Sequence, residues 1–202
     1  MNPIGHFHTI TEHKLLVMKH CFKIGLYRQG LLHDMSKYMP CEFLVGAKYY
    51  QGTRSPNNAE REAKGYSAAW LHHKGRNKHH FEYWIDYGLE NGHNMEGMRM
   101  PRKYVAEMLA DRIAASKVYN KGTYTQHHPL EYFLKGKSHY MIHPKTQQEL
   151  EHLLRILDKY GEDVCFDYVK NVYLRKKPLS AKIRRINRKM ASSKTLIAGY
   201  DK

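Results

Sequence analysis

The sequence predicts an all-α fold, with a helical domain over residues 1–174 and a basic tail over residues 175–202. Apolar side chains recur at helical spacing, and hardly any stretch alternates with the period of two that a half-buried strand requires. Two capping boxes, Thr9-x-x-Glu12 and Thr146-x-x-Glu149, mark helix starts. Hydrophobic residues make up 42% of the 202 residues and charged residues 26%, a balance typical of one globular domain.

Four elements are expected in the N-terminal quarter. The first capping box predicts a helix over 9–26, which places four side chains on one face: His13, Val17, His20 and Ile24. A short helix is expected over 31–38. Pro40 suits the first turn of a third helix that reaches about Tyr50. The turn residues of 51–58 predict a loop.

The middle of the chain predicts two more helices, over 59–73 and 81–87, joined through the short connection 74–78. Three glycines within 88–99 predict a loop there.

Pro101 then begins a long helix that reaches about Tyr119. Its expected inward face consists of Tyr104, Met108, Asp111, Ala115 and Val118. The second capping box opens a leucine-rich helix, carrying Leu150, Leu153, Leu154 and Leu157. Gly161 ends that helix, and a last one reaches about Lys176.

Composition narrows the function classes. No apolar run approaches the roughly 20 residues of a membrane span, and residues 1–10 lack an apolar signal segment, so the expected location is the cytoplasm without a membrane partner.

Three scattered cysteines, Cys21, Cys41 and Cys165, argue against a disulfide framework or a cysteine zinc site and are expected in the core. The 15 histidines are the first indication of chemistry, because histidine is the commonest metal ligand.

The motif His33-Asp34-x-x-Lys37 carries the strongest chemical signal. On a helix, His33 and Asp34 could both reach a metal between them, and Lys37 would share their side. The first-helix histidines and Asp111 could add ligands, because a carboxylate that faces a core is costly unless it is paired or metal-bound. A salt bridge for Asp111, and a satisfied core role for His13 or His20, remain the simpler alternatives.

The order of these residues resembles the HD superfamily of metal-dependent phosphohydrolases, with HDMSK matching its H-D-x-x-K form. The resemblance covers roughly residues 9–120 and implies an HD-domain-like helical bundle with additional C-terminal helices. It also extends to a group of short bacterial and phage proteins with similar HH…HHxEYW and MP…EMxAD sequence motifs. The implied metal ligands are His13, His33, Asp34 and Asp111, with His20 as the alternative on the first helix.

Members with two metals carry further histidines between the His-Asp pair and the last Asp. Here the resemblance implies His73, with His79 or His80, as ligands of a second ion, although a surface histidine cluster is the alternative. No Gly-Tyr-Pro follows, so specificity for cyclic dinucleotides is not supported. One or two divalent ions (Mn, Fe, Co, Ni or Zn) are the expected cofactors.

The expected function is hydrolysis of a nucleotide or other phosphate ester by a metal-activated water. Asp34, Lys37 and His73 are the expected catalytic residues, and Lys37, Arg76 and Lys78 are expected to bind phosphate. Ordinary solvated charge is the alternative for Arg76 and Lys78.

Two other functions compete. Ten Lys or Arg against one Asp in 175–202 give the tail nine of the net fifteen positive charges, which could contact nucleic acid while the histidines hold a structural metal. The chain could also be an HD-like scaffold without catalysis, although every ligand type is retained. Substrate, metal and oligomeric state stay open.

Overall fold

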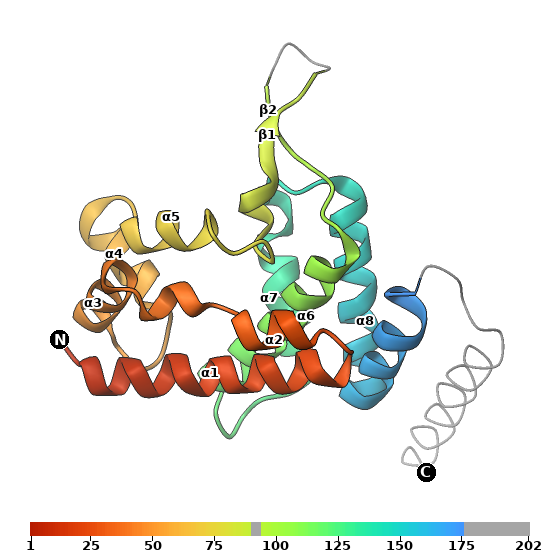
Figure 1. Cartoon of the computed structure of the whole chain (residues 1–202), viewed down its shortest axis with the longest axis horizontal. Helices are drawn as coiled ribbons and strands as arrows, with labels where there is room; N and C mark the ends of the chain where they lie inside the picture. Colours follow the sequence, from red (N-terminus) through yellow and green to blue (C-terminus); the bar gives the residue numbers. More distant parts are fainter. Residues whose placement is uncertain (90–93, 176–202) are drawn as a thin grey trace.

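Within residues 1–89 and 94–175, which a computed structural model describes, the chain forms eight α-helices and one small hairpin (Figure 1), confirming the all-α prediction. The α-helices are α1 (Pro3–Lys23), α2 (Tyr27–Leu32), α3 (Pro40–Tyr49), α4 (Pro56–Lys64), α5 (Ala68–Lys74), α6 (Arg102–Tyr119), α7 (His128–Gly136) and α8 (Pro144–Tyr168). Shorter helical segments are η1 (Met35–Tyr38), η2 (Phe81–Trp84), η3 (Lys137–His139) and η4 (Val169–Tyr173). The strands are β1 (Ile85–Tyr87) and β2 (Met95–Gly97).

Helix α1 starts six residues before the predicted capping box. Asn2 caps it by accepting a hydrogen bond from the Gly5 N–H at 2.8 Å, and Pro3 occupies the first helical position. The hydroxyl of Thr9 instead lies 2.7 Å from that of Tyr50, which ties α1 to the end of α3. The predicted start at Thr9 was therefore wrong, because the Asn-Pro cap overrides the second signal.

The prediction of one helix over 31–38 was wrong as well. Helix α2 ends at Leu32, His33 has an extended ψ of 127°, and Asp34 has a left-handed φ of 53°. Among the described non-glycine residues, Asp34 is the one with a positive φ. The short helix η1 then starts directly after Asp34, whose carbonyl accepts from the Lys37 N–H.

The predicted helix over 59–73 is two helices. Gly65 ends α4 with a φ of 79°, and Ser67 caps α5 by accepting from the Trp70 N–H. The buried carboxylate of Glu60 accepts from the Ser67 hydroxyl at 2.7 Å and fixes the corner. Pro56 starts α4 inside the predicted loop 51–58.

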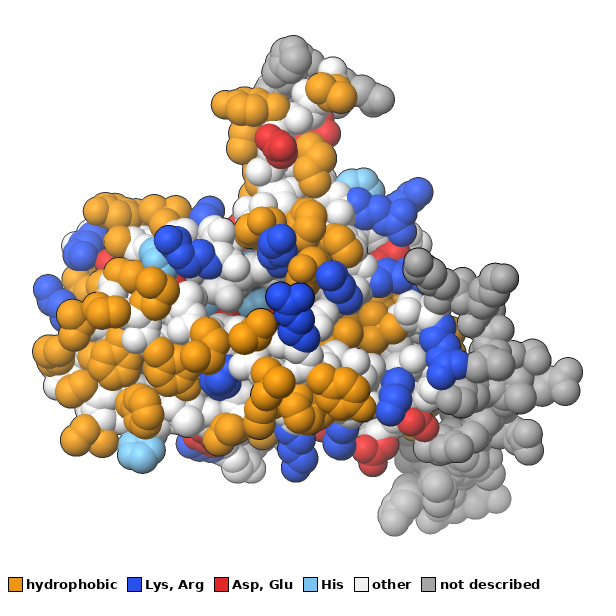
Figure 2. Space-filling model, in the orientation of Figure 1, with side chains coloured by type: hydrophobic (Ala, Val, Ile, Leu, Met, Phe, Trp, Pro, Cys, Tyr) orange, Lys and Arg blue, Asp and Glu red, His pale blue; other side chains and the backbone are white. Residues whose placement is uncertain are grey.

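The predicted helix over 81–87 and loop over 88–99 were partly wrong. A single turn of 3-10 helix, η2, leads into β1, which pairs antiparallel with β2 through Asp86 and Glu96. Strands of three residues are too short to show alternation in sequence. The hairpin stands out from the helical body (Figures 1 and 2).

Helix α6 forms the centre of the fold, in contact with α1, α7 and α8. Its residues Val105, Leu109 and Ile113 are fully buried in the main core. Facing them in this core are Phe133 of α7 and the predicted leucines of α8, namely Leu150, Leu153, Leu154 and Leu157. In the expected inward face of α6, Met108 and Val118 are buried as predicted, and Met108 belongs to the core. Met108, Asp111, Ala115 and Val118 also line a cavity.

Helix α8 begins at Pro144, two residues before the predicted capping box. Thr146 is buried, and its hydroxyl accepts from the Met100 N–H at 3.1 Å. Gly161 interrupts the helix with a φ of 85°, as predicted, and helical geometry resumes to Tyr168 before η4.

Three further expectations bear on the whole chain. The basic tail lies outside the described residues, apart from Arg175. No described helix combines the length and apolar character that a bilayer span needs. Cys21 and Cys165 are buried as expected, whereas Cys41 is exposed.

Candidate metal centre

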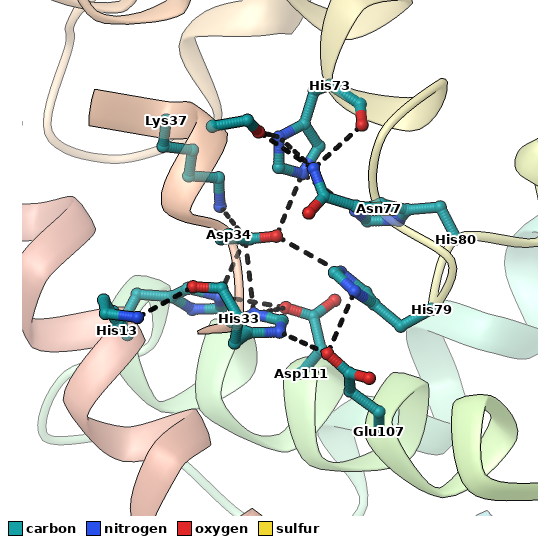
Figure 3. Close-up of polar contacts among 12 residues, drawn as sticks. His13, His33, Asp34, Lys37, His73, Asn77, His79, His80, Glu107 and Asp111 are labelled. Atoms are coloured by element: carbon teal, nitrogen blue, oxygen red, sulfur yellow. Dashed lines mark hydrogen bonds and ion pairs between the residues drawn. The ribbon is translucent and has the colours of Figure 1, made fainter. Parts of the chain in front are cut away.

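Five separate segments bring their imidazoles and carboxylates together beneath the cavity (Figure 3). His13 comes from α1, the pair His33-Asp34 from the link between α2 and η1, and His73 from α5. His79 and His80 precede η2, and Asp111 comes from α6. All the predicted ligands therefore meet, although they span 99 positions of the sequence from first to last.

The left-handed backbone at Asp34 directs its carboxylate into the middle of this cluster (Figure 3). His33 and Asp34 do reach a common point, as predicted. They do so because the helix ends before them, and not because they are neighbours on one helix. Lys37 lies on the same side, with its Nζ 2.7 Å from Asp34 Oδ2, which agrees with its predicted position.

One oxygen of Asp34 belongs to a first group of donors. His33 Nε2 lies 3.3 Å from Asp34 Oδ2 and 3.4 Å from Asp111 Oδ1. His13 Nε2 lies 2.9 Å from the same Asp111 oxygen. These four residues each present one ligand atom within 4.8 Å of the others, which matches the set that the resemblance implied.

The other oxygen of Asp34 belongs to a second group. Both His73 Nε2 and His79 Nε2 lie 3.3 Å from Asp34 Oδ1, and His80 Nε2 lies 2.9 Å from His73 Nε2. These four residues again gather their ligand atoms within 4.8 Å. Both His79 and His80 belong to this group, so the choice between them does not arise.

Five of the converging atoms make no hydrogen bond to a described residue: His13 Nε2, His33 Nε2, His79 Nε2, and Asp34 Oδ1 and Oδ2. A buried polar atom without a hydrogen bond costs roughly 1–3 kcal/mol. Ion pairs with Lys37 and Asp111 offset part of this cost at Asp34 Oδ2 and His13 Nε2, but five such atoms in one place still indicate a shared ligand. Divalent cations held by Asp34, Asp111 and the histidines of the two groups would satisfy all of them. Imidazole and carboxylate donors fit Mn, Fe, Co, Ni or Zn.

Two carboxylates that the sequence did not single out hold the outer sides of the imidazoles. Glu107 Oε1 lies 3.1 Å from His33 Nδ1 and 3.3 Å from His79 Nδ1. Glu42 Oε2 lies 2.9 Å from His73 Nδ1. Such outer partners fix the tautomer so that Nε2 faces a metal.

A sequence signal existed for Glu107 but not for Glu42. Glu107 precedes Asp111 by one helical turn, so both face the same side of the helix. A buried carboxylate at Glu107 needs a charged or hydrogen-bonding partner, as Asp111 does. Glu42 faces His73 only because α3 packs against α5.

Electrostatics keep both acidic ligands ionised. Burial opposes charge on Asp34, but His33 and Lys37 hold the pKa of its carboxyl well below the ordinary value. Burial also opposes charge on Asp111, whereas contacts from His13 and His33 keep its pKa well below the ordinary range. The pKa of His13 is lowered by burial and by Lys37, which favours the neutral imidazole that binds metals.

Three other predicted positions lie apart. His20, the alternative ligand on α1, directs its Nδ1 toward the carbonyl of Ala110 at 3.3 Å and belongs to neither donor group. Arg76 and Lys78 are exposed and do not line the cavity. Their role in phosphate binding stays a prediction that this geometry does not favour.

A cavity of about 630 Å³ opens above the centre. Its lining includes Lys37 and four candidate ligands, His13, His73, His80 and Asp111. Its walls carry other cations and aromatic rings, among them Arg54, Arg61, Trp70, Arg112, Tyr119 and Tyr140. A small molecule in this cavity would therefore contact the metal-ligand atoms directly.

The chain was compared with known families, curated proteins and solved structures. A family model described as "Family of unknown function (DUF5662)" matches residues 2–156. The chain belongs to the DUF5662 family. No curated protein and no solved structure matches it. The DUF5662 match includes every residue of both donor groups and ends within α8.

Proposed function

We propose that this protein is a metal-dependent phosphohydrolase, acting on a nucleotide or a related phosphate ester. The observation that supports it most directly is the carboxylate of Asp34, whose two oxygens face two separate groups of buried imidazole nitrogens. Three of these nitrogens, in His13, His33 and His79, make no hydrogen bond to a described residue. The ligand order along the chain supports the resemblance to the HD superfamily. Bound divalent cations would neutralise phosphate oxygens and lower the pKa of a coordinated water so that it can attack phosphorus.

The side chains around the centre divide the remaining work. Lys37 ion-pairs with Asp34 and lines the cavity, so its ammonium can bind a phosphate oxygen beside the centre. Burial opposes its charge, but Asp34 and Asp111 raise the pKa of Lys37, so it stays cationic. Glu107 and Glu42 orient the imidazoles and need not contact substrate.

Accessibility favours this proposal over nucleic-acid binding with a structural metal. Structural zinc sites are closed by four protein ligands, often cysteines. Here four of the ligand residues line an open cavity, and none of the three cysteines belongs to a donor group among the described residues.

The test combines metal analysis with activity. Purified protein should contain one or two equivalents of a transition metal and hydrolyse nucleoside monophosphates or bis-p-nitrophenyl phosphate. The double variant His33→Ala with Asp34→Ala should lose the metal and at least 10³-fold of the activity, a typical scale for a lost catalytic group. Activity that survives in this variant would refute the assignment.

Two of the three buried histidines of α1, His13 and His20, give a matched pair of variants. His13→Gln removes a ligand, whereas His20→Gln removes a buried imidazole two turns away that faces Ala110. We expect metal loss and inactivity in the first and near-normal values in the second at neutral pH. Equal losses in both variants would indicate general damage to α1.

A further inference from the structure

Three more buried polar atoms without hydrogen bonds lie outside both donor groups, in His6, Glu82 and Arg112. Glu82 Oε2 and Arg112 Nε make no hydrogen bond to a described residue. Both side chains line the same cavity as the metal centre. One atom is an acceptor and the other a donor, and no ion pair within 4.0 Å joins the two residues among the described contacts.

Aromatic rings hold Arg112 and the segment that carries Glu82. The Arg112 guanidinium lies over the rings of Phe133 and Tyr140, at 5.6 and 5.8 Å from their centroids. Phe81, the neighbour of Glu82, packs on the same Tyr140 ring at 5.0 Å between centroids. The Arg112 guanidinium and the residue before Glu82 are therefore held against one tyrosine.

Glycine at position 136 makes this arrangement possible. A Cβ there would collide with the hydroxyl and ring of Tyr140, so the absence of a side chain lets the tyrosine lie against α7. The aromatic wall behind Arg112 depends on that close approach.

The same two residues stand next to the metal centre in sequence and in space. Arg112 follows the ligand Asp111, and Glu82 comes two positions after the ligand His80. Both side chains line the cavity that is also lined by His80 and Asp111. A bound molecule held at the metals would meet both groups.

We propose that Glu82 and Arg112 determine specificity by binding the hydrogen-bonding edge of a nucleobase in the organic part of the substrate. Glu82 would accept from a base N–H, and Arg112 Nε would donate to a neighbouring base acceptor. Guanine presents this pattern, with N1–H beside O6. The inference rests on the proposed function, which places the phosphate at the metals.

The chemistry of the cavity favours a base over a simple sugar phosphate. Leaving a buried donor or acceptor unpaired is costly, so a site with one of each selects a ligand that offers both. The flat rings of Trp70 and Tyr119 on the cavity wall suit an aromatic ligand that stacks.

Calorimetry on the Mn²⁺-loaded full-length protein tests the proposal. Dissociation constants are measured for guanosine 5′-monophosphate and for ribose 5-phosphate, which lacks the base. In the wild type we expect the nucleotide to bind at least tenfold more tightly. In Glu82→Met and in Arg112→Met this advantage should fall at least tenfold, because each variant removes one hydrogen-bonding partner of the base and keeps most of the side-chain volume.

Asp163→Asn is the matched control, because Asp163 is an exposed acid that pairs with Lys23 at 3.3 Å far from the cavity. It should bind both compounds as the wild type does. If one of the cavity variants does not fold, the other still decides the question.

The proposal is overturned if the wild type does not prefer the nucleotide, or if the variants weaken both compounds equally. Its failure differs from failure of the proposed function. Tight nucleotide binding without any hydrolysis would refute the phosphohydrolase proposal alone, whereas hydrolysis with an unchanged preference in both variants would refute this inference alone.

Discussion

Asp34 combines three tasks that are rarely assigned to one residue. Its left-handed backbone precedes η1, its two oxygens face separate donor groups, and its charge pairs with Lys37. A left-handed conformation costs a non-glycine residue roughly 1–2 kcal/mol, and Asp tolerates it better than most. Such strain persists where the surroundings fix it, which agrees with a functional role for this position.

Replacing Glu107 by Gln should weaken metal binding without removing a ligand. The variant loses the carboxylate that faces Nδ1 of both His33 and His79, so each imidazole becomes a poorer and less well-oriented donor. We expect metal affinity to fall about 10- to 100-fold, measured by competition with a chelator of known affinity.

Glu149→Gln makes the same chemical change outside the cluster, where the carboxylate accepts from Tyr173 and Arg99. Its metal affinity should match that of the wild type. An unchanged affinity in Glu107→Gln would show that Glu107 does not support the ligands.

His20 should make folding stability depend on pH. Burial, with a further effect of Lys117, lowers the pKa of His20 to about 4 in the folded protein. Above pH 6.5 the His20 imidazole is neutral in both the folded and the unfolded protein, so it does not change the free energy of unfolding. As the pH falls from 6.5 toward 4, the unfolded chain gains a proton that the folded protein does not, so stability is lost, by about 2 kcal/mol at pH 5.

The variant His20→Gln should lose less stability than the wild type over that interval. The measurement is the free energy of unfolding in urea at pH 7.5 and pH 5 for both proteins, and the quantity compared is the change between the two pH values. Parallel losses in the two proteins would show that His20 does not titrate as described.

At the scale of elements, long helices with strong periodicity were predictable and short elements were not. The helix from Pro101 to Tyr119 and the one from Pro40 were expected within a residue of α6 and α3. The segments η1, η2, β1 and β2 have only three or four residues each, so tertiary contacts decide their conformation.

Gly97 illustrates how contacts decide the hairpin. A Cβ at this position would lie 2.6 Å from the backbone N of His143 and 2.7 Å from the backbone carbonyl carbon of Ile142. Backbone cannot move aside as a side-chain end can, so Gly97→Ala should destabilise the protein by about 1–3 kcal/mol, measured by urea unfolding.

Gly75→Ala is the matched control, because a Cβ there would meet its nearest neighbour at 3.4 Å and the local φ is −72°. Its free energy of unfolding should stay near that of the wild type. If Gly97→Ala were equally neutral, the contact between β2 and the 142–143 segment would be loose.

At the scale of the whole molecule, the cluster joins α1, the α2–η1 link, α5, the turn before η2 and α6. A ligand that binds only the folded state stabilises it by mass action, by about 4 kcal/mol at a thousandfold excess over the dissociation constant. Removal of metal by a chelator should therefore lower the melting temperature by roughly 10 °C, and added metal should restore it.

The His33→Ala with Asp34→Ala variant provides the comparison, because its melting temperature should not respond to chelator or metal. Calorimetric melting of both proteins, with and without chelator, checks this. A wild-type melting temperature that ignores chelation would argue against metal binding at the cluster.

The sequence by itself determined the helical class, the two long helices of the core, and which residue types are available for chemistry. Periodicity and composition carry that information, because the residues that a helix buries recur along the chain at helical spacing. It also indicated His13, His33, Asp34, His73 and Asp111, but only as residues in a suggestive order.

Only the tertiary structure decided which of these side chains meet. It selected His13 over His20 through the rotation of α1 against α6, and it brought Glu42 and Glu107 behind the imidazoles. It also broke the helix at Asp34 and left Arg76 and Lys78 outside the cavity. The physical reason is that a ligand cluster depends on directions and distances between segments far apart in the chain, and those follow from packing that no local pattern records.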